Sequence, residues 1–100
     1  MNKRILRYVE ENYKEANLKS LSESLHYDVS ALSREIKSKT GKNFTDIVQE
    51  KRLSVASFLL RKTNMNTDDI AKSVGYENIS FFHRLFKASF GVTPKKYRDR

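Results

Sequence analysis

Apolar residues recur along most of the chain at the spacing of three or four positions that is typical of amphipathic helices. No segment shows the strict alternation of apolar and polar residues that predicts a half-buried strand. Only three glycines and one proline interrupt the pattern. The sequence therefore predicts an all-α fold.

Seven helices follow from this spacing and from residues that favour helix ends. Asn, Asp and Thr side chains cap helix N-termini, and glycine commonly follows the last helical residue. The predicted caps are Asn17, Asp28, Asn43, Asn66, Asn78 and Thr93, and the glycines are Gly41 and Gly91. The predicted helices span residues 2–13, 18–25, 29–40, 44–62, 67–74 and 79–90, with a short last helix that begins at Pro94.

Several of these helices have a predicted buried face, among them the helices at 18–25 (Leu18, Leu21 and Leu25) and 29–40 (Leu32 and Ile36). The helix at 2–13 is expected to bury Ile5, Leu6, Val9 and Tyr13. The helix at 44–62 is expected to bury Ile47, Val48, Val55, Ala56, Leu59 and Leu60. No stretch rich in Ser, Gly or Pro divides the chain, so this long helix is the natural bridge between two halves. The predicted organisation is a first subdomain at 1–42, a linker helix at 43–62 and a second subdomain at 63–100.

The two halves repeat a common sequence pattern. Leu21, Ser24 and Tyr27 align in order with Ile70, Ser73 and Tyr76. After one extra residue in the second turn, segments 34–41 and 84–91 share the pattern Arg-x-(Ile/Phe)-Lys-x-x-x-Gly. Each half thus combines a short helix, a turn with a tyrosine and a longer helix, which is the helix-turn-helix arrangement in duplicate.

The longer helix of each unit has a polar stripe at helical spacing. Small serines permit close approach to a major groove, arginine can donate two hydrogen bonds to guanine, and lysine contacts phosphate. A solvated helix face is the alternative, but the recurrence of the stripe on both aligned helices favours DNA binding. The candidate DNA-binding residues are Ser30, Ser33, Arg34, Lys37, Ile79, Ser80, His83, Arg84 and Lys87.

The charge agrees with a polyanionic partner. The net charge is +8, and residues 51–100 carry eleven basic against four acidic residues, whereas residues 1–50 carry nine against eight. A basic helical module that binds RNA or an anionic membrane without sequence specificity remains the alternative. The chain has no apolar run long enough to span a membrane and no cysteine, so a cytoplasmic location is expected.

No residues have the spacing of a catalytic or metal site. His26 and His83 are isolated, and Asp68 and Asp69 occupy a first helical turn, where they complement the helix dipole. No Gly-rich phosphate loop or nucleophile elbow is present. We therefore expect no enzymatic activity, no cofactor, no metal and no small-molecule ligand in this domain. Core packing is the expected role of Phe82, Phe86 and Phe90, with Phe81 at the surface.

Several ordered segments resemble the DNA-binding domain of the AraC/XylS family of bacterial transcription regulators. They are Asp69-Ile70-Ala71, Gly75-Tyr76, Ser80-Phe81-Phe82-His83-Arg84-Leu85-Phe86-Lys87 and Gly91-Val92-Thr93-Pro94-Lys95-Lys96-Tyr97-Arg98. The long helix adds a similar pattern through Arg52, Ala56, Leu59 and Leu60. Two positions depart from the family pattern: His26 replaces a turn glycine, and Ile36 replaces an aromatic residue.

The resemblance implies a transcription regulator whose third and sixth helices enter successive major-groove segments on one face of the DNA. It also makes RNA polymerase a candidate partner, and it implies that a sensing or dimerisation domain often precedes such a module. Histidine tolerates a positive φ better than β-branched residues do, so we expect the first turn to form despite His26.

Overall fold

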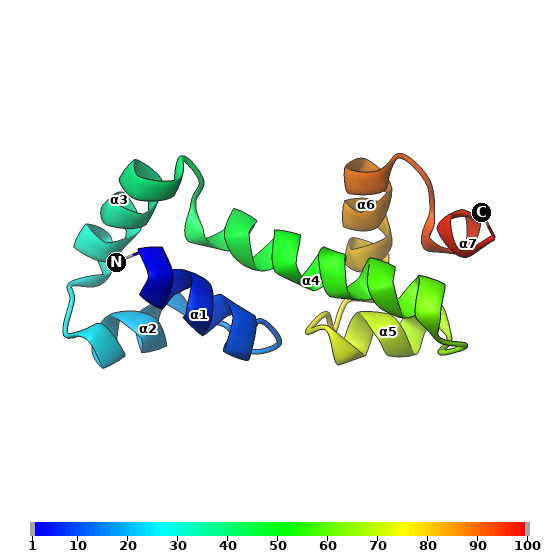
Figure 1. Cartoon of the computed structure of the whole chain (residues 1–100), viewed down its shortest axis with the longest axis horizontal. Coiled ribbons are helices and arrows are strands. Elements are labelled where there is room, and N and C mark those ends of the chain that lie inside the picture. The colour runs from blue at the N-terminus through cyan, green and yellow to red at the C-terminus, as the bar shows by residue number, and fades with distance from the viewer. Residues whose placement is uncertain (1, 100) are drawn as a thin grey trace. The chain divides into compact units, whose positions relative to one another are not determined.

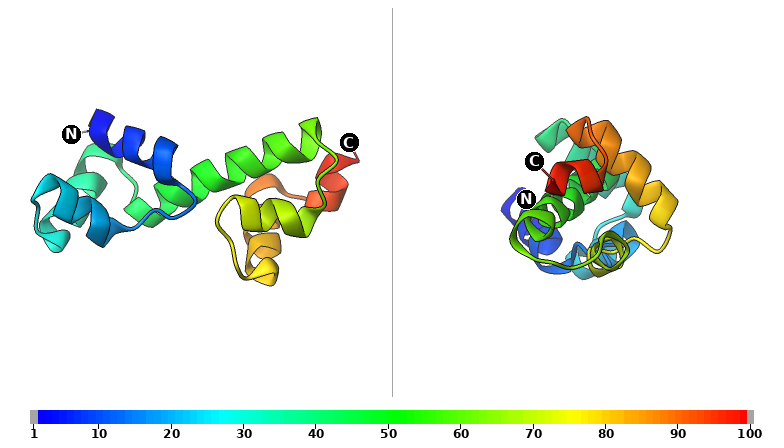
Figure 2. Two further views of the ribbon diagram at one scale, coloured as in Figure 1. Left: turned by 90° about the horizontal axis from the view of Figure 1, so that it is seen from below. Right: turned by 90° about the vertical axis from the view of Figure 1, so that its right-hand side faces the viewer.

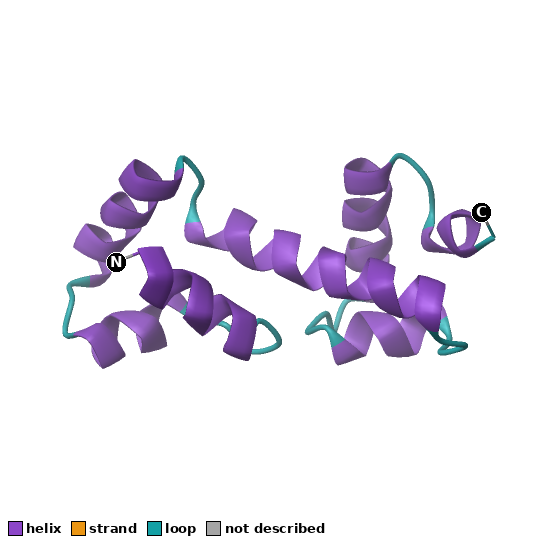
Figure 3. Ribbon diagram, viewed as in Figure 1, coloured by secondary structure: helices purple, strands orange, loops and turns teal. Residues whose placement is uncertain are grey.

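The computed structural model describes residues 2–99, which form helices and connecting loops without a strand (Figures 1 and 3). The helices are α1 (Asn2–Asn12), α2 (Leu18–Leu25), α3 (Val29–Thr40), α4 (Phe44–Lys62), α5 (Thr67–Ser73), α6 (Ile79–Phe90) and α7 (Pro94–Arg98). The predicted all-α fold is confirmed, and the predicted helix ends agree within one residue. Met1 and Arg100, the outer ends of the two predicted subdomains, lie outside the described residues.

Side-chain caps explain why the helices begin where the sequence predicts. The caps of α2 to α7 each accept a hydrogen bond from the backbone N–H three residues later, with distances from 2.8 to 3.3 Å. These caps are Asn17, Asp28, Asn43, Asn66, Asn78 and Thr93. Each such cap stabilises its helix by about 1 kcal/mol, because it satisfies a donor that the helix leaves unpaired.

The chain divides within α4 into two compact units, Met1–Lys51 and Arg52–Arg100. In unit 1, α1 and α3 bury facing residues in one core with the first half of α4. The core residues of unit 1 are Ile5, Val9, Leu21, Leu32, Ile36, Phe44, Ile47 and Val48. α4 therefore contributes to the core of unit 1 and also connects unit 1 to unit 2. The predicted boundaries of a separate linker helix at 43–62 stay a prediction.

In unit 2, α5 and α6 lie beside the second half of α4 (Figures 1 and 2). The buried apolar residues here are Leu53, Ala56, Leu60, Ile70, Ala71, Val74, Tyr76, Phe82 and Phe86. This core is richer in aromatic residues than the core of unit 1. Phe86, Phe90 and Tyr97 form a cluster that holds α7 against α6, with ring centroids 4.4 to 5.3 Å apart.

The buried faces of α1 and α4 differ in part from the prediction. Leu6 was expected in the core, but 56% of its surface is exposed, because Ile5 and Val9 at a spacing of four residues define the inner face of α1. Tyr13 follows the end of α1. On α4, Val55 and Leu59 are half-buried rather than buried, and Leu53 and Ser57 are buried although neither is predicted from the sequence.

The turns that end α2, α3 and α6 use the left-handed backbone region. His26 has a φ of 58°, and its N–H and that of Tyr27 donate to the carbonyl oxygens of Glu23 and Ser22. Gly41 and Gly91 end their helices at φ values of 77° and 80°. The expected break after α2 is confirmed. At this break His26, which has a Cβ atom, occupies a backbone conformation that glycine adopts without strain.

We expect His26→Gly to raise the free energy of unfolding by about 1 kcal/mol, because the substitution removes the strain of a left-handed residue with a Cβ. Gly41→Ala is the matched control and should lower it by a similar amount. A Cβ at Gly41 would meet no atom within 4 Å, so any loss of stability would come from the backbone alone. Urea unfolding followed by circular dichroism measures both changes. A loss of stability in His26→Gly would contradict the prediction.

Candidate functional site

The outer face of α3 presents the residues predicted for unit 1. Leu32 and Ile36 are fully buried, which turns Ser30, Arg34 and Lys37 toward solvent. The half-buried Ser33 lies on the same stripe. The Lys37 ammonium donates a hydrogen bond of 3.1 Å to the carbonyl oxygen of Gly41, so in the free protein it caps the C-terminus of its own helix.

The outer face of α6 has the same construction in unit 2. Here Phe82 and Phe86 are fully buried, and the exposed residues are Ser80, Arg84 and Lys87. Ile79 and His83 are half-buried. The His83 ring meets the edge of Phe82 at a centroid distance of 5.8 Å.

The basic residues of both outer faces are available to an anionic partner. Among the described residues, no carboxylate forms an ion pair with Arg34, Lys37, Arg84 or Lys87. The structure therefore brings the predicted residues of each unit onto one exposed face, with small side chains beside long cationic ones. Their assignment to DNA stays a prediction.

Other basic residues in unit 2 are engaged by the fold. The Arg98 guanidinium donates hydrogen bonds of 3.0 and 3.2 Å to the carbonyl oxygens of Leu60 and Thr63, at the end of α4. The Arg52 guanidinium carbon lies 5.2 Å from the ring centroid of Tyr76. These two arginines stabilise the unit, so the basic surplus of the second half overstates the charge available to a partner.

The aligned tyrosines of the two units have different environments. Tyr76 is only 5% exposed, and its ring contacts Phe81 and Phe82 at centroid distances of 6.1 and 5.6 Å. Burial raises the pKa of Tyr76 above its ordinary value of 10.0, and the positive charge of Arg52 opposes this rise. The Tyr76 hydroxyl is buried without a hydrogen-bond partner among the described residues.

In unit 1 the equivalent Tyr27 is 40% exposed, because Ala31 and Leu32 replace the phenylalanines that enclose Tyr76. Val29, the first residue of α3, is 41% exposed. Neither Tyr27 nor Val29 is predicted from the sequence as a site residue. The signal in the sequence that could have identified Val29 is its alignment with Ile79, which is one of the predicted DNA-binding residues.

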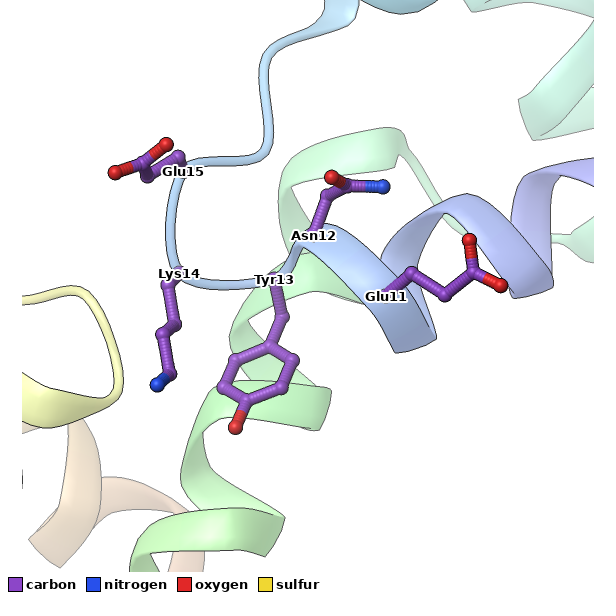
Figure 4. A pocket seen from close by; sticks show the side chains of 5 residues that line it. All are labelled: Glu11, Asn12, Tyr13, Lys14 and Glu15. Atoms are coloured by element: carbon purple, nitrogen blue, oxygen red, sulfur yellow. The ribbon is translucent and has the colours of Figure 1, made fainter.

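A hollow in unit 1 has no arrangement suited to chemistry. It has a volume of ≈ 370 Å³ and is lined by Glu11, Asn12, Tyr13, Lys14 and Glu15, at the end of α1 and in the loop that follows (Figure 4). Tyr13 and Lys14 extend in the same direction from the loop, whereas Glu11 and Glu15 point away from each other (Figure 4). Within residues 2–99, no group of three or more His, Cys, Asp or Glu residues is placed to hold a metal ion.

Comparison with known proteins identifies the family. A family model described as a helix-turn-helix domain matches residues 21–100. The chain belongs to the AraC/XylS-type helix-turn-helix family. The resemblance found in the sequence is confirmed, and the family consists of transcription regulators.

Relatives of this AraC/XylS-type domain include an uncharacterized HTH-type transcriptional regulator of Bacillus subtilis, YisR. The two are 37% identical over 93 residues, which are 92% of this chain and 32% of YisR. This chain thus spans about a third of that regulator's length. None of the helices formed by residues 2–99 has the length and apolar character needed to cross a membrane.

Solved structures share the fold. The C-terminal domain of the two-component response regulator YesN from Fusobacterium nucleatum is 34% identical, with a TM-score of 0.91 over 97% of this chain and 96% of that chain. The DNA-binding domain of the global transcriptional factor AdpA, solved with a target DNA, has a TM-score of 0.87 at 18% identity. That match covers 97% of this chain and 88% of the AdpA chain.

The environment of Tyr76 generates a prediction about pH. A raised pKa in the folded state gives stability that is present below the ordinary pKa of tyrosine and is lost as pH rises through the folded value. Tyr76→Phe should therefore unfold less readily than the wild type above about pH 10. At neutral pH it should be at least as stable, because it removes a buried hydroxyl without a partner.

Thermal unfolding at neutral and alkaline pH measures this difference. Tyr27→Phe is the matched control, since it removes the hydroxyl of the exposed tyrosine in the other unit. If Tyr76→Phe and the wild type lose the same stability between the two conditions, Tyr76 is not the group whose ionisation opposes folding.

Proposed function

We propose that this chain regulates transcription by binding duplex DNA in a sequence-specific manner, with α3 and α6 entering successive major-groove segments. The observation that supports it most directly is the paired outer faces. Each combines exposed serine with arginine and lysine side chains that have no carboxylate partner among the described residues. The AdpA domain, which has the same fold, was solved with DNA.

The residues divide by the chemistry of their side chains. Arg34 and Arg84 reach guanine with two parallel hydrogen bonds each, which discriminates against a wrong base. Lys37 and Lys87 contact phosphates, which hold the domain on DNA without selecting sequence. The remaining contacts to bases or phosphates come from Ser30, Ser33, Ile79, Ser80 and His83.

The wider setting of the proposal follows from the family. The relatives YisR of Bacillus subtilis and RhaS of Mannheimia succiniciproducens are bacterial regulators about three times as long as this chain. We place it in the cytoplasm, with promoter DNA as its ligand and RNA polymerase as a partner. We propose no catalytic step, cofactor or small-molecule ligand for the domain itself.

Binding should be strongly dependent on salt. If the two outer faces together engage about six to eight phosphates, a plot of log affinity against log salt concentration should have a slope of about −5 to −7. Fluorescence anisotropy with a labelled duplex measures the slope, and vesicles of anionic lipid and a single-stranded RNA are the controls. A slope of about −1, or an affinity for the vesicles equal to that for the duplex, would contradict the assignment of the outer faces to DNA.

Arginine and lysine variants should separate base recognition from phosphate binding. Arg34→Ala and Arg84→Ala should each relax specificity at a different position, about 10 base pairs apart, at a cost of about 1–3 kcal/mol. Lys37→Ala and Lys87→Ala should weaken binding to all sequences and flatten the salt slope by about one unit. Selection of sites from a random duplex pool tests each variant. If both arginine variants select the wild-type site, the arginines only position the domain.

A further inference from the structure

The N-terminal end of α3 presents apolar side chains to solvent. Tyr27 and Val29 flank Asp28, whose carboxylate accepts a hydrogen bond of 3.1 Å from the N–H of Ala31 and so begins the helix. Their exposed fractions are 40% and 41%. These two side chains, two residues apart, leave apolar surface in water that burial against a ligand would stabilise.

This exposure is not a requirement of the repeated unit. In unit 2, the equivalent tyrosine is enclosed by Phe81, Phe82 and Arg52. In unit 1 an aromatic pair forms elsewhere, between Tyr8 and Phe44, at a centroid distance of 6.2 Å. The core of unit 1 is thus formed without Tyr27, which is left at the surface two residues before Val29.

The location of these side chains restricts what they can contact. The first residues of a recognition helix are those that approach base edges in the major groove. Thymine alone presents a methyl group there, and apolar side chains are what recognise it. Ser30 follows Val29 and is small and exposed, so it permits the start of α3 to approach the base edges closely.

We propose that Val29, bordered by Tyr27, recognises the C5-methyl group of a thymine in the half-site bound by unit 1. The inference rests on the proposed function and extends it. Unit 1 then adds an apolar contact at the start of α3 to the contacts of Arg34, whereas in unit 2 the aligned Ile79 is half-buried.

Deoxyuridine differs from thymidine only by lacking the methyl group, so it tests the contact directly. The wild-type chain is first used to select sites from a random duplex pool. Each thymine of the selected site is then replaced singly by deoxyuridine. We expect one position in the half-site of unit 1 to lose affinity by about three- to fivefold, the effect of one buried methyl group.

Val29→Ala should bind the thymine and deoxyuridine duplexes with nearly equal affinity, because it lacks the two γ-methyl groups that reach the thymine methyl. Tyr27→Ala should show a smaller difference in affinity between the thymine and deoxyuridine duplexes than the wild type does. Leu6→Ala is the matched control, since Leu6 is an exposed apolar residue of unit 1 outside α3. It should keep the full preference for thymine.

Failure of the inference and failure of the proposed function give different results. A selected site that tolerates deoxyuridine at every position would overturn the inference and leave specific DNA binding intact. Persistence of the thymine preference in Val29→Ala would also overturn it, because another residue would then contact the methyl group. If no sequence is enriched from the pool, specific binding itself is wrong.

Discussion

The burial of two apolar side chains, spaced four residues apart, fixes the rotation of α3 and of α6, each about its own axis. In α3 these are Leu32 and Ile36, and in α6 they are Phe82 and Phe86, all fully buried. Once they are seated, the helix has no freedom to choose which residues face outward. The polar stripe, the available cations and the exposed helix start all follow from this constraint.

The same constraint lets the two units diverge without loss of the common arrangement. Unit 1 fills its core with aliphatic side chains and the Tyr8–Phe44 pair, whereas unit 2 uses a continuous aromatic cluster. Changing Phe82 to the leucine found at the equivalent position of unit 1 leaves the helix anchored but removes one wall around the tyrosine. A difference in core composition thus becomes a difference in the apolar surface exposed beside the helix start.

Most of the fold was predictable because local signals fix the helix ends. Asn17, Asp28 and Asn78 cap their helices in the structure as the sequence predicts. What the sequence did not reveal depends on contacts between distant segments. Tyr27 is exposed because the phenylalanines that enclose Tyr76 in unit 2 have no counterpart around it. In the sequence Arg98 looks like part of a basic surface, and only the structure shows that its guanidinium is bonded to the end of α4. Of the candidate site, the sequence predicted the polar stripes and overlooked the apolar start of α3.

Arg98 also shows why charge alone is a poor guide to a binding surface. Its guanidinium satisfies two carbonyl oxygens at the end of α4, which the helix itself leaves without donors. A cation placed there interacts favourably with the negative end of the helix dipole whether or not DNA is present. Lys37 occupies a comparable position on α3 but bonds to the carbonyl of Gly41 through a flexible, exposed side chain. Because that bond is single and comes from an exposed side chain, it is more easily exchanged for a bond to an anionic partner than are the two bonds that hold Arg98 in the fold.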